Sequence, residues 1–297
     1  LSCDHRAVDG AVAAELLGVP WDSVDITWGN TSRHLPWSCI SGGSQTIHAM
    51  TRSAHAAASD AIAKAKQIAA RTLGGQPDDY TVADERVSGR GRSLSLADVA
   101  QKAVELGGTF DGHELPQNIN PFTVTSASAL AGQGLMGVAK DTYPRDGQTH
   151  SYVAGFAEVE VDPDTGVIEV VSYTAMDDCG NVVDHTIVEG QLMGGIAQGA
   201  GQALGEHGIY DRETGQLLTG SFMDYFMLRA GWLKDLRIGD NGVPSPTNPI
   251  GVKGVGESGT TGSIPAIANA VMNALRQVGV KGIDMPLTPA RVWGAIQ

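Results

Sequence analysis

The sequence predicts an α+β protein of two lobes. A long alanine-rich helix pattern occupies residues 46–73, whereas β-rich runs at 151–162 and 166–175 mark a change of character further along the chain. Strands and helices mix without the regular alternation of βαβ units, which favours α+β over α/β. With 297 residues, 42% of them hydrophobic, the chain can bury a sizeable core. We expect the first lobe at residues 1–110 and the second at 111–297.

The elements of the first lobe have clear start and stop signals. Gly74 and Gly75 end the long helix, because glycine readily adopts the conformation found just past a helix C-terminus. Ser95 and Asp98 begin the next helix with the spacing of a capping box. The elements expected are a helix at 11–17, a strand at 24–28, the helix at 46–73, a hairpin at 80–87 and a helix at 95–106.

Turn residues divide the second lobe in the same way. Pro163 to Gly166 join the two β-rich runs as a hairpin. Ser263 is a suitable N-cap for the last helix and Pro265 suits its first turn. The elements expected are strands at 151–162 and 166–175, a helix at 188–204, a hairpin around 213–215 and a helix at 265–278.

The overall composition excludes several classes of function. The formal net charge is −13, and neither nucleic acid nor an anionic membrane surface attracts a protein without a basic face. No apolar run approaches the roughly 18 residues that a membrane-spanning helix needs, and the N-terminus does not resemble a signal peptide. The three cysteines form no C-x-x-C pair, so we expect no metal site built from side chains of this chain. An acidic cytoplasmic protein is the prediction.

A glycine-rich loop at residues 248–259 surrounds one carboxylate, that of Glu257. The glycines allow the backbone to approach a bulky group closely, and a glutamate held on such a loop can act as a general base. The alternative is an ordinary loop carboxylate beside a helix N-terminus. A dinucleotide-binding G-x-G-x-x-G is excluded because Pro244, Pro246 and Pro249 leave no strand in front of it.

A second candidate lies on the helix predicted at 188–204. Spacings of four and three residues place Gly190, Gly194, Gln198 and Gly201 on one face. Small residues there would admit a flat body, and the Gln198 amide offers a donor and an acceptor to a heterocycle. The alternative is close packing of the helix with Gln198 at an exposed end.

The third candidate is Gly43-Ser44-Gln45, which leads into the helix at 46–73. Backbone N–H groups and a hydroxyl at a helix N-terminus can bind an anion or a phosphate. The alternative is a plain cap without a ligand.

Together these three segments resemble the C-terminal molybdenum-binding region of the xanthine dehydrogenase/aldehyde oxidase/carbon monoxide dehydrogenase family. The resemblance covers residues 13–297. Further segments that carry it are 156–166, 177–181, 218–225, 246–257 and 284–293.

In that family a glutamate acts as a base beside a molybdenum–pterin cofactor while an aldehyde or an N-heterocycle is hydroxylated with oxygen from water. The resemblance implies that Glu257 is the catalytic base. It implies molybdenum–molybdopterin as cofactor, a cytosine dinucleotide form included. The cofactor contacts that it implies are Gly43, Ser44, Gln45, Gln198 and Gly256.

The resemblance also implies partners. Electrons leave the family's molybdenum site through [2Fe–2S] centres to FAD or another acceptor. Because the chain has no cysteine pattern for such clusters, we expect an iron–sulfur subunit and an FAD subunit as separate chains. The family's molybdenum region is longer than this chain, so we also expect a chain that carries its first half and completes the site.

Residues 1–10 carry a different resemblance, to the D-H-R-x-x-D-G segment of dihydrolipoamide acyltransferases. His5 and Asp9 match that motif, and in those enzymes the histidine is the general base. A base also needs an acceptor pocket and an oxyanion donor, which ten residues cannot build. An acyltransferase fragment that uses His5 remains the competing class, and a non-catalytic scaffold or assembly chain is the third.

Overall fold

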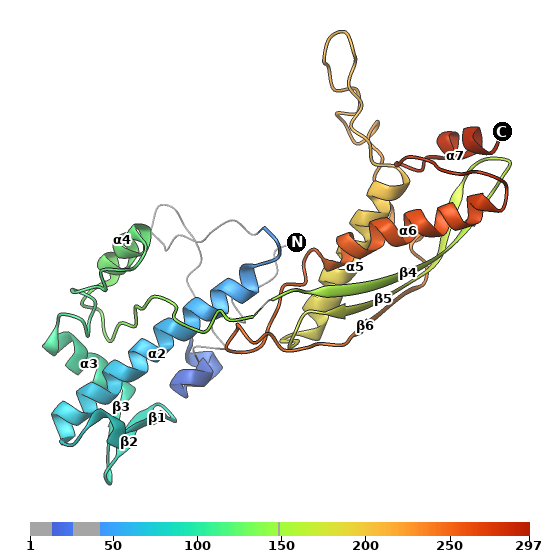
Figure 1. Cartoon of the computed structure of the whole chain (residues 1–297). Coiled ribbons are helices and arrows are strands. Elements are labelled where there is room, and N and C mark those ends of the chain that lie inside the picture. The colour runs from blue at the N-terminus through green and yellow to red at the C-terminus, as the bar shows by residue number, and fades with distance from the viewer. Residues whose placement is uncertain (1–13, 26–41, 148) are drawn as a thin grey trace. The chain divides into compact units, whose positions relative to one another are not determined.

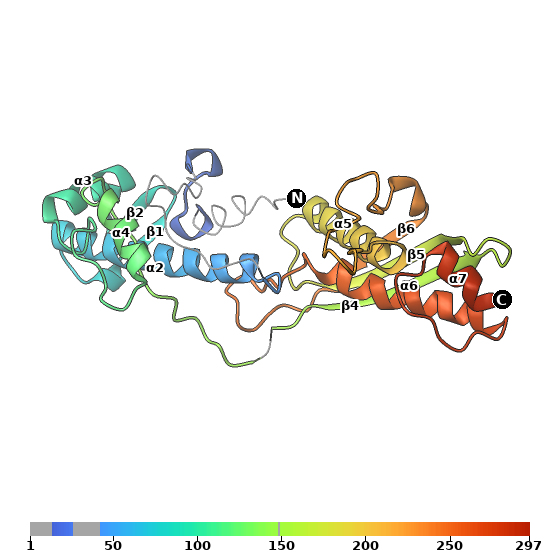
Figure 2. The ribbon, with the colours of Figure 1, turned by 90° about the horizontal axis from the view of Figure 1, so that it is seen from above.

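The computed structural model describes residues 14–25, 42–147 and 149–297. Its helices and strands, shown in Figures 1 and 2, form two compact units. Each unit combines helices with a three-stranded sheet, which confirms the predicted α+β class.

Unit 1 contains the chain up to residue 148 together with residues 246–250, and unit 2 contains 149–245 and 251–297. The division therefore differs from the expected boundary between residues 110 and 111, which falls inside unit 1.

Helix α2 (Thr46–Leu73) is the centre of unit 1 and has the predicted bounds. Its end is set locally, since Gly74 has φ +84° and its N–H donates to Ala70 O over 2.9 Å. Ala65, Ile68 and Ala69 lie on one face of α2 and are fully buried against the small sheet and α3. The other elements are η1 (Trp21–Ser23), η3 (Pro77–Asp79), β1 (Thr81–Ala83), β2 (Arg86–Gly89), β3 (Arg92–Ser95), α3 (Leu96–Leu106) and α4 (Pro121–Leu130).

Residues near and beyond the expected boundary at 110 pack into unit 1. The Phe110 ring is buried, and the Arg71 guanidinium lies 4.8 Å from its centre. Met136 N donates to Phe110 O over 2.9 Å, and Lys64 Nζ donates to Met136 O over 2.8 Å. These contacts with α2 explain why the unit extends well beyond residue 110.

Unit 2 is a layer of two helices on a sheet in the order β4-β5-β6, with β4 antiparallel and β6 parallel to β5. Ile196 and Ala200 of α5 and Ile267 and Val271 of α6 are fully buried in its core. The elements are β4 (Tyr152–Val161), β5 (Ile168–Asp178), α5 (His185–Leu204), η4 (Ala230–Trp232), β6 (Leu236–Asp240), α6 (Ser258–Arg276) and α7 (Pro289–Ile296).

The predicted start of the last long helix is wrong. Helix α6 begins at Ser258, so that Ser263 and Pro265 lie inside it. The added turn is held by α5: a Cβ on Gly259 would lie 2.5 Å from Leu192 O, so the two backbones are in close contact. Tertiary packing therefore overrides the local proline signal.

Of the remaining predicted elements, one is confirmed and others lie partly outside the described residues. The hairpin around 213–215 is confirmed as a bridge between Tyr210 and Leu217. Residues 14–17 are helical, but the rest of the predicted 11–17 helix and most of the 24–28 strand lie outside the described residues, as do His5 and Asp9.

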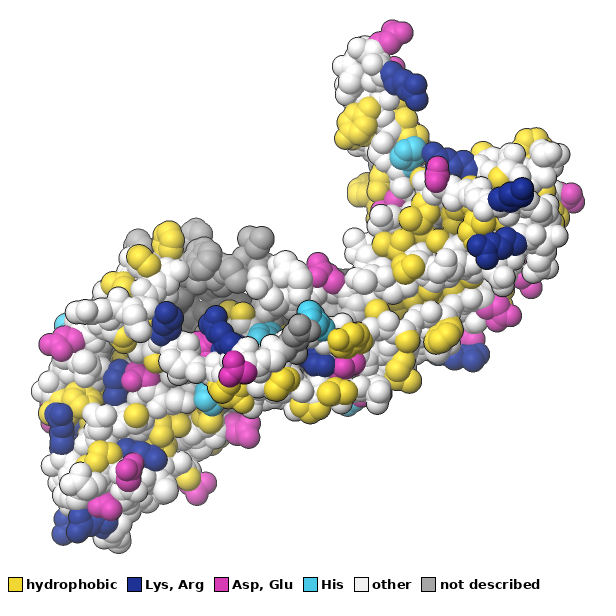
Figure 3. Space-filling view, in the orientation of Figure 1, with side chains coloured by type: hydrophobic (Ala, Val, Ile, Leu, Met, Phe, Trp, Pro, Cys, Tyr) yellow, Lys and Arg dark blue, Asp and Glu magenta, His cyan; other side chains and the backbone are white. Residues whose placement is uncertain are grey.

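Charge on the surface is mixed. On the face shown in Figure 3, Lys and Arg side chains lie among Asp and Glu side chains. In the part of the chain that the structure describes, no helix has both the length and the apolar character needed to cross a membrane.

Candidate catalytic and cofactor site

Glu257 lies at the N-cap position of α6, with an exposed side chain. Its carbonyl accepts the Thr261 N–H over 2.9 Å, and the next residue, Ser258, donates its N–H to Val255 O over 3.1 Å. Gly256, the preceding residue, is also exposed. The backbone of this turn is thus fixed while the carboxylate faces outward.

The structure places Gln198 beside the same turn. The Thr260 hydroxyl, three residues after Glu257, lies 3.1 Å from Gln198 Oε1 and 3.0 Å from Gly195 O. Gln198 is exposed on α5. Gln198 therefore contacts the first turn of α6, which Glu257 caps, although the two predicted site residues are distant in sequence.

Glycines of α5 allow this close approach. A Cβ on Gly195 would lie 2.9 Å from Thr260 N, and one on Gly199 would lie 2.0 Å from Ser263 Oγ. By contrast, a Cβ on Gly190 would meet no atom within 4 Å. Helix packing thus explains Gly195 and Gly199, whereas Gln198 stands at the exposed edge.

The turn after β5 holds the glycine-rich loop. Lys253 N donates to Cys179 O over 2.8 Å, and the buried Lys253 Nζ lies 2.8 Å from Asp178 Oδ2. Gly180 has φ +72°, and a Cβ there would lie 2.3 Å from Gly251 O. The loop that leads to Glu257 is therefore fixed by both backbone and charge.

The Asp178 carboxylate accepts several hydrogen bonds in addition to its ion pair with Lys253. Its Oδ1 accepts the N–H groups of Gly180 over 3.1 Å and Val243 over 2.9 Å. Burial raises the pKa of Asp178, but the hydrogen bonds from Lys253, Val243 and Gly180 outweigh it and hold the pKa below its usual range.

The neighbouring Asp177 has the opposite environment. Only 1% of its surface is exposed, and among the residues that the structure describes neither carboxylate oxygen has a hydrogen-bond partner at proper geometry. Burial raises the pKa of Asp177 to about 6, while the nearby Ser258 and Cys179 side chains act in the opposite direction.

Gly43, Ser44 and Gln45 immediately precede α2, in unit 1. Gly43 has φ +64° and Ser44 has φ 53°, and a Cβ on Gly43 would meet no atom of the described residues within 4 Å. Gln45 occupies the N-cap position and accepts the Ala49 N–H over 2.9 Å. The turn thus has a backbone shape that suits glycine, with open space beside it.

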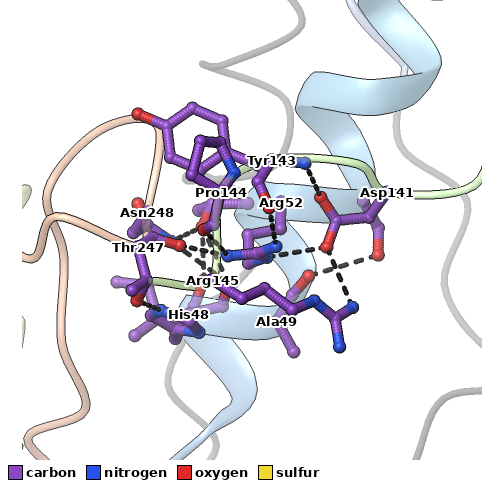
Figure 4. A network of polar contacts seen from close by, with 12 residues as sticks. His48, Ala49, Arg52, Asp141, Tyr143, Pro144, Arg145, Thr247 and Asn248 are labelled. Carbon is purple, nitrogen blue, oxygen red and sulfur yellow. Dashed lines mark hydrogen bonds and ion pairs between the residues drawn. The ribbon is translucent and has the colours of Figure 1, made fainter. Parts of the chain in front are cut away.

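Figure 4 shows a polar network in unit 1 around Arg52, a buried residue of α2. Arg52 Nε donates to Asp141 Oδ2 over 2.7 Å, and Nη2 donates to Tyr143 O over 2.7 Å. Nη1 donates to Pro144 O over 3.2 Å and to Thr247 O. One guanidinium therefore joins α2, the segment at 141–144 and the segment at 246–250.

Two further contacts fix the 246–250 segment on α2. His48 Nε2 lies 3.1 Å from Thr247 Oγ1, and Asn248 Nδ2 donates to Thr51 Oγ1 over 2.8 Å. Burial, then the nearby Arg52 charge, lowers the pKa of His48, which favours its neutral form. This segment leads directly into the loop that contains Glu257.

Sequence reasoning missed Arg52, Asp177 and Lys253 as residues of interest. Charged residues are rarely buried, so residue type alone did not single out any of them. The one signal available for Asp177 was its place in the inward-facing alternation of β5, with Tyr173 and Ala175.

No group of three or more His, Cys, Asp or Glu side chains suitable for a metal ion occurs within residues 14–25, 42–147 and 149–297.

The comparisons with known proteins identify a family for most of the chain. Residues 5–233 match the family described as a molybdopterin cofactor-binding domain.

Two relatives illustrate the similarity. The carbon monoxide dehydrogenase large chain of Hydrogenophaga pseudoflava is 31% identical over 296 residues, which cover 99% of this chain and 34% of that protein. The nicotine 6-hydroxylase large subunit of Paenarthrobacter nicotinovorans is 30% identical over 291 residues, which cover 97% and 33%.

Among solved structures, quinoline 2-oxidoreductase from Pseudomonas putida 86 superposes with a TM-score of 0.77 at 30% identity, covering 100% of this chain and 36% of that one. The chain thus spans about a third of the length of the relatives it matches.

Proposed function

We propose, because the chain belongs to the molybdopterin cofactor-binding domain family, that it forms part of the cofactor site of a molybdenum hydroxylase. The observation that carries the proposal is the meeting of Gln198 and the Glu257 turn through Thr260. It supports a single site at the exposed junction of α5 and α6, with an amide beside a potential base.

The residues present fit a large polar cofactor. Gln198, Gly256 and Glu257 are all exposed, and the amide of Gln198 can both donate and accept a hydrogen bond. Within unit 1, no atom of the described residues would lie within 4 Å of a Cβ on Gly43, which suits close approach of a ligand to the backbone of the Gly43–Gln45 turn. We assign Gln198, Gly256 and Glu257 of unit 2 as residues that would hold molybdenum–molybdopterin, in its cytosine dinucleotide form, and assign Gly43, Ser44 and Gln45 of unit 1 to the same role separately.

When bound, the cofactor would supply the two-electron oxidation. The part that we assign to the chain is the transfer of one proton to a carboxylate oxygen of Glu257. The hydrogen bond from Thr261 N to Glu257 O and the Lys253–Asp178 pair keep the base in place, and such preorganisation lowers the cost of reaching the reactive geometry. Gln198 would orient the ligand beside it.

The substrate that we propose is an aldehyde or an N-heterocycle. The relatives' names support this class, since they include nicotine 6-hydroxylase, quinoline 2-oxidoreductase and an aldehyde oxidoreductase of Escherichia coli. We further propose that the complex works in the cytoplasm and that partner chains carry the [2Fe–2S] centres, the FAD and the rest of the molybdenum region. The alternative acyltransferase motif, at His5 and Asp9, gains no support from the described residues.

The test is purification of the complex that contains this chain, followed by elemental analysis and turnover with aldehydes and N-heterocycles. We expect molybdenum and phosphorus. Glu257→Gln should keep both elements and lower turnover by about 10²- to 10⁴-fold, the range typical of a lost general base.

Glu189→Gln, on an exposed carboxylate of α5, is the matched control and should leave turnover unchanged. Near-normal turnover in Glu257→Gln would remove the base assignment. Absence of molybdenum from an otherwise intact complex would remove the proposed function itself.

A further inference from the structure

The carboxyl group of Asp177 is buried in the fold but makes no hydrogen bond of proper geometry with the described residues. The inward face of β5 presents Tyr173, Ala175 and Asp177, and Asp177 is 1% exposed. Neither of its oxygens has a hydrogen-bond partner within the described residues. Because an unpartnered buried polar group destabilises the folded state, its presence calls for an explanation.

This carboxyl group lies under the first turn of α6. The side chains that favour its ionised form are those of Ser258 and Cys179. Ser258 is itself buried and is the residue that directly follows Glu257. A change of charge at Asp177 therefore acts on the turn that presents the proposed base.

The charged groups around Asp177 disfavour its ionisation. Asp178, next on β5, and Asp240, its partner on β6, both raise its pKa. Lys253, the cation paired with the neighbouring Asp178, lies 2.8 Å from that carboxylate. From β4, the residue opposite Asp177 is the uncharged Val153.

The remaining neighbouring groups are on the turn after β5 and on α6. Burial raises the pKa of Cys179 to about 12, so that its thiol stays neutral. On α6, Ser258 is uncharged and the Glu257 side chain is exposed. Asp177 is thus the group in this layer whose charge changes near neutral pH.

An ionised Asp177 carboxylate would need hydrogen-bond donors. Once charged, the carboxylate is stabilised by N–H groups at a helix N-terminus, which the first turn of α6 provides. Reaching them requires the turn to shift or water to enter. We propose that Asp177 is a positioning residue whose protonation keeps the Glu257 turn closely packed and whose ionisation loosens it. The importance of this turn for catalysis rests on the proposed function, whereas the coupling itself does not.

The test is hydrogen exchange of the segment at 251–262 in the purified complex, between pH 5 and pH 8, after correction for intrinsic exchange rates. Protection should fall as the pH rises through about 6. Between pH 5 and pH 8 the fall should be about 10-fold, since only about one of the two units by which the pKa of Asp177 is raised lies above pH 5. Asp177→Asn should show the same protection at both pH values.

Asp240→Asn is the matched variant, because it removes a neighbouring negative charge and leaves the buried carboxyl in place. Its exchange transition should persist and move to lower pH. An identical pH response in Asp177→Asn and the unchanged chain would overturn the proposal.

If Asp177→Asn does not fold, the unchanged protein still provides a test. Its infrared spectrum should contain the band of a protonated carboxyl group that disappears through about pH 6, and a spectrum without this titration would overturn the proposal. Neither measurement depends on turnover. A complex without molybdenum would therefore remove the proposed function and leave this coupling to be judged by exchange alone.

Discussion

The contact between α5 and α6 makes a sharp prediction about two glycines of the same helix. A Cβ on Gly195 would lie 2.9 Å from Thr260 N and 3.0 Å from Gly259 Cα, both of them backbone atoms. Backbone cannot rotate away as a side chain can, so α6 must shift. A Cβ on Gly190 would meet nothing within 4 Å. Alanine at these two positions therefore isolates the effect of packing from that of helix propensity.

The two substitutions should change the free energy of unfolding in opposite directions. Alanine is favoured over glycine in a helix by about 1 kcal/mol, and Gly190→Ala should gain up to this amount. Overpacking costs about 1–3 kcal/mol, so Gly195→Ala should lose up to about 2 kcal/mol after the same gain is subtracted. At roughly 2–4 °C per kcal/mol, its melting temperature should fall by up to about 8 °C.

Thermal unfolding followed by circular dichroism measures both variants against the unchanged chain. Gly195→Ala should also increase hydrogen exchange at the turn that contains Glu257, since Thr260 and Gly259 are the residues displaced. Equal stability of Gly190→Ala and Gly195→Ala would show that the two helices are not in the close contact described.

Two further predictions concern buried charge. Arg52→Leu removes a buried guanidinium that pairs with the partly buried Asp141 and donates to backbone carbonyls of Tyr143, Pro144 and Thr247. It should cost up to about 3–5 kcal/mol of unfolding free energy in a urea titration. Arg145→Leu, whose side chain is 75% exposed beside the same Asp141, should cost about 1 kcal/mol or less in the same titration. Burial raises the pKa of Asp177 from 3.8 to about 6. The contribution of Asp177 to the free energy of unfolding is therefore highest below pH 3.8, where the carboxyl group is protonated in both states, and it decreases as the pH rises through 6. Asp177→Asn should therefore be more stable than the unchanged chain above pH 6, by up to about 3 kcal/mol, with no difference near pH 3.8 in melting temperature.

The helices with local signals at both ends could be predicted from sequence. Helix α2 has the expected bounds because Gly74 stops it, and α3 begins as expected because Ser95 and Asp98 form the capping box. The start of α6 could not be predicted, since the glycines that hold its first turn belong to another helix. The same reasoning holds for the site: the glycine loop and Gln198 were visible in the sequence, but their junction through Thr260 was not.

Buried charges were missed for a related reason. Arg52 lies in an alanine-rich helix, where a cation suggests a solvated face, and its partners Asp141 and Thr247 are 89 and 195 residues away. A partner so distant gives no local pattern. Asp177 satisfies the inward-facing strand alternation of β5, but carboxylates are rarely buried, so the alternation alone did not mark it as a buried group.

Two effects on the stability of the first turn of α6 oppose each other. Packing of Gly259 on Leu192 O fixes the turn for stability, whereas the buried carboxyl of Asp177 beneath it weakens that stability at neutral pH. A fold selected for stability alone would place an apolar residue at this position, since Asp177 makes no hydrogen bond of proper geometry among the described residues that would be lost. We infer that this cost in stability is retained because the charge state of Asp177 acts on Ser258 and so on the turn that carries Glu257.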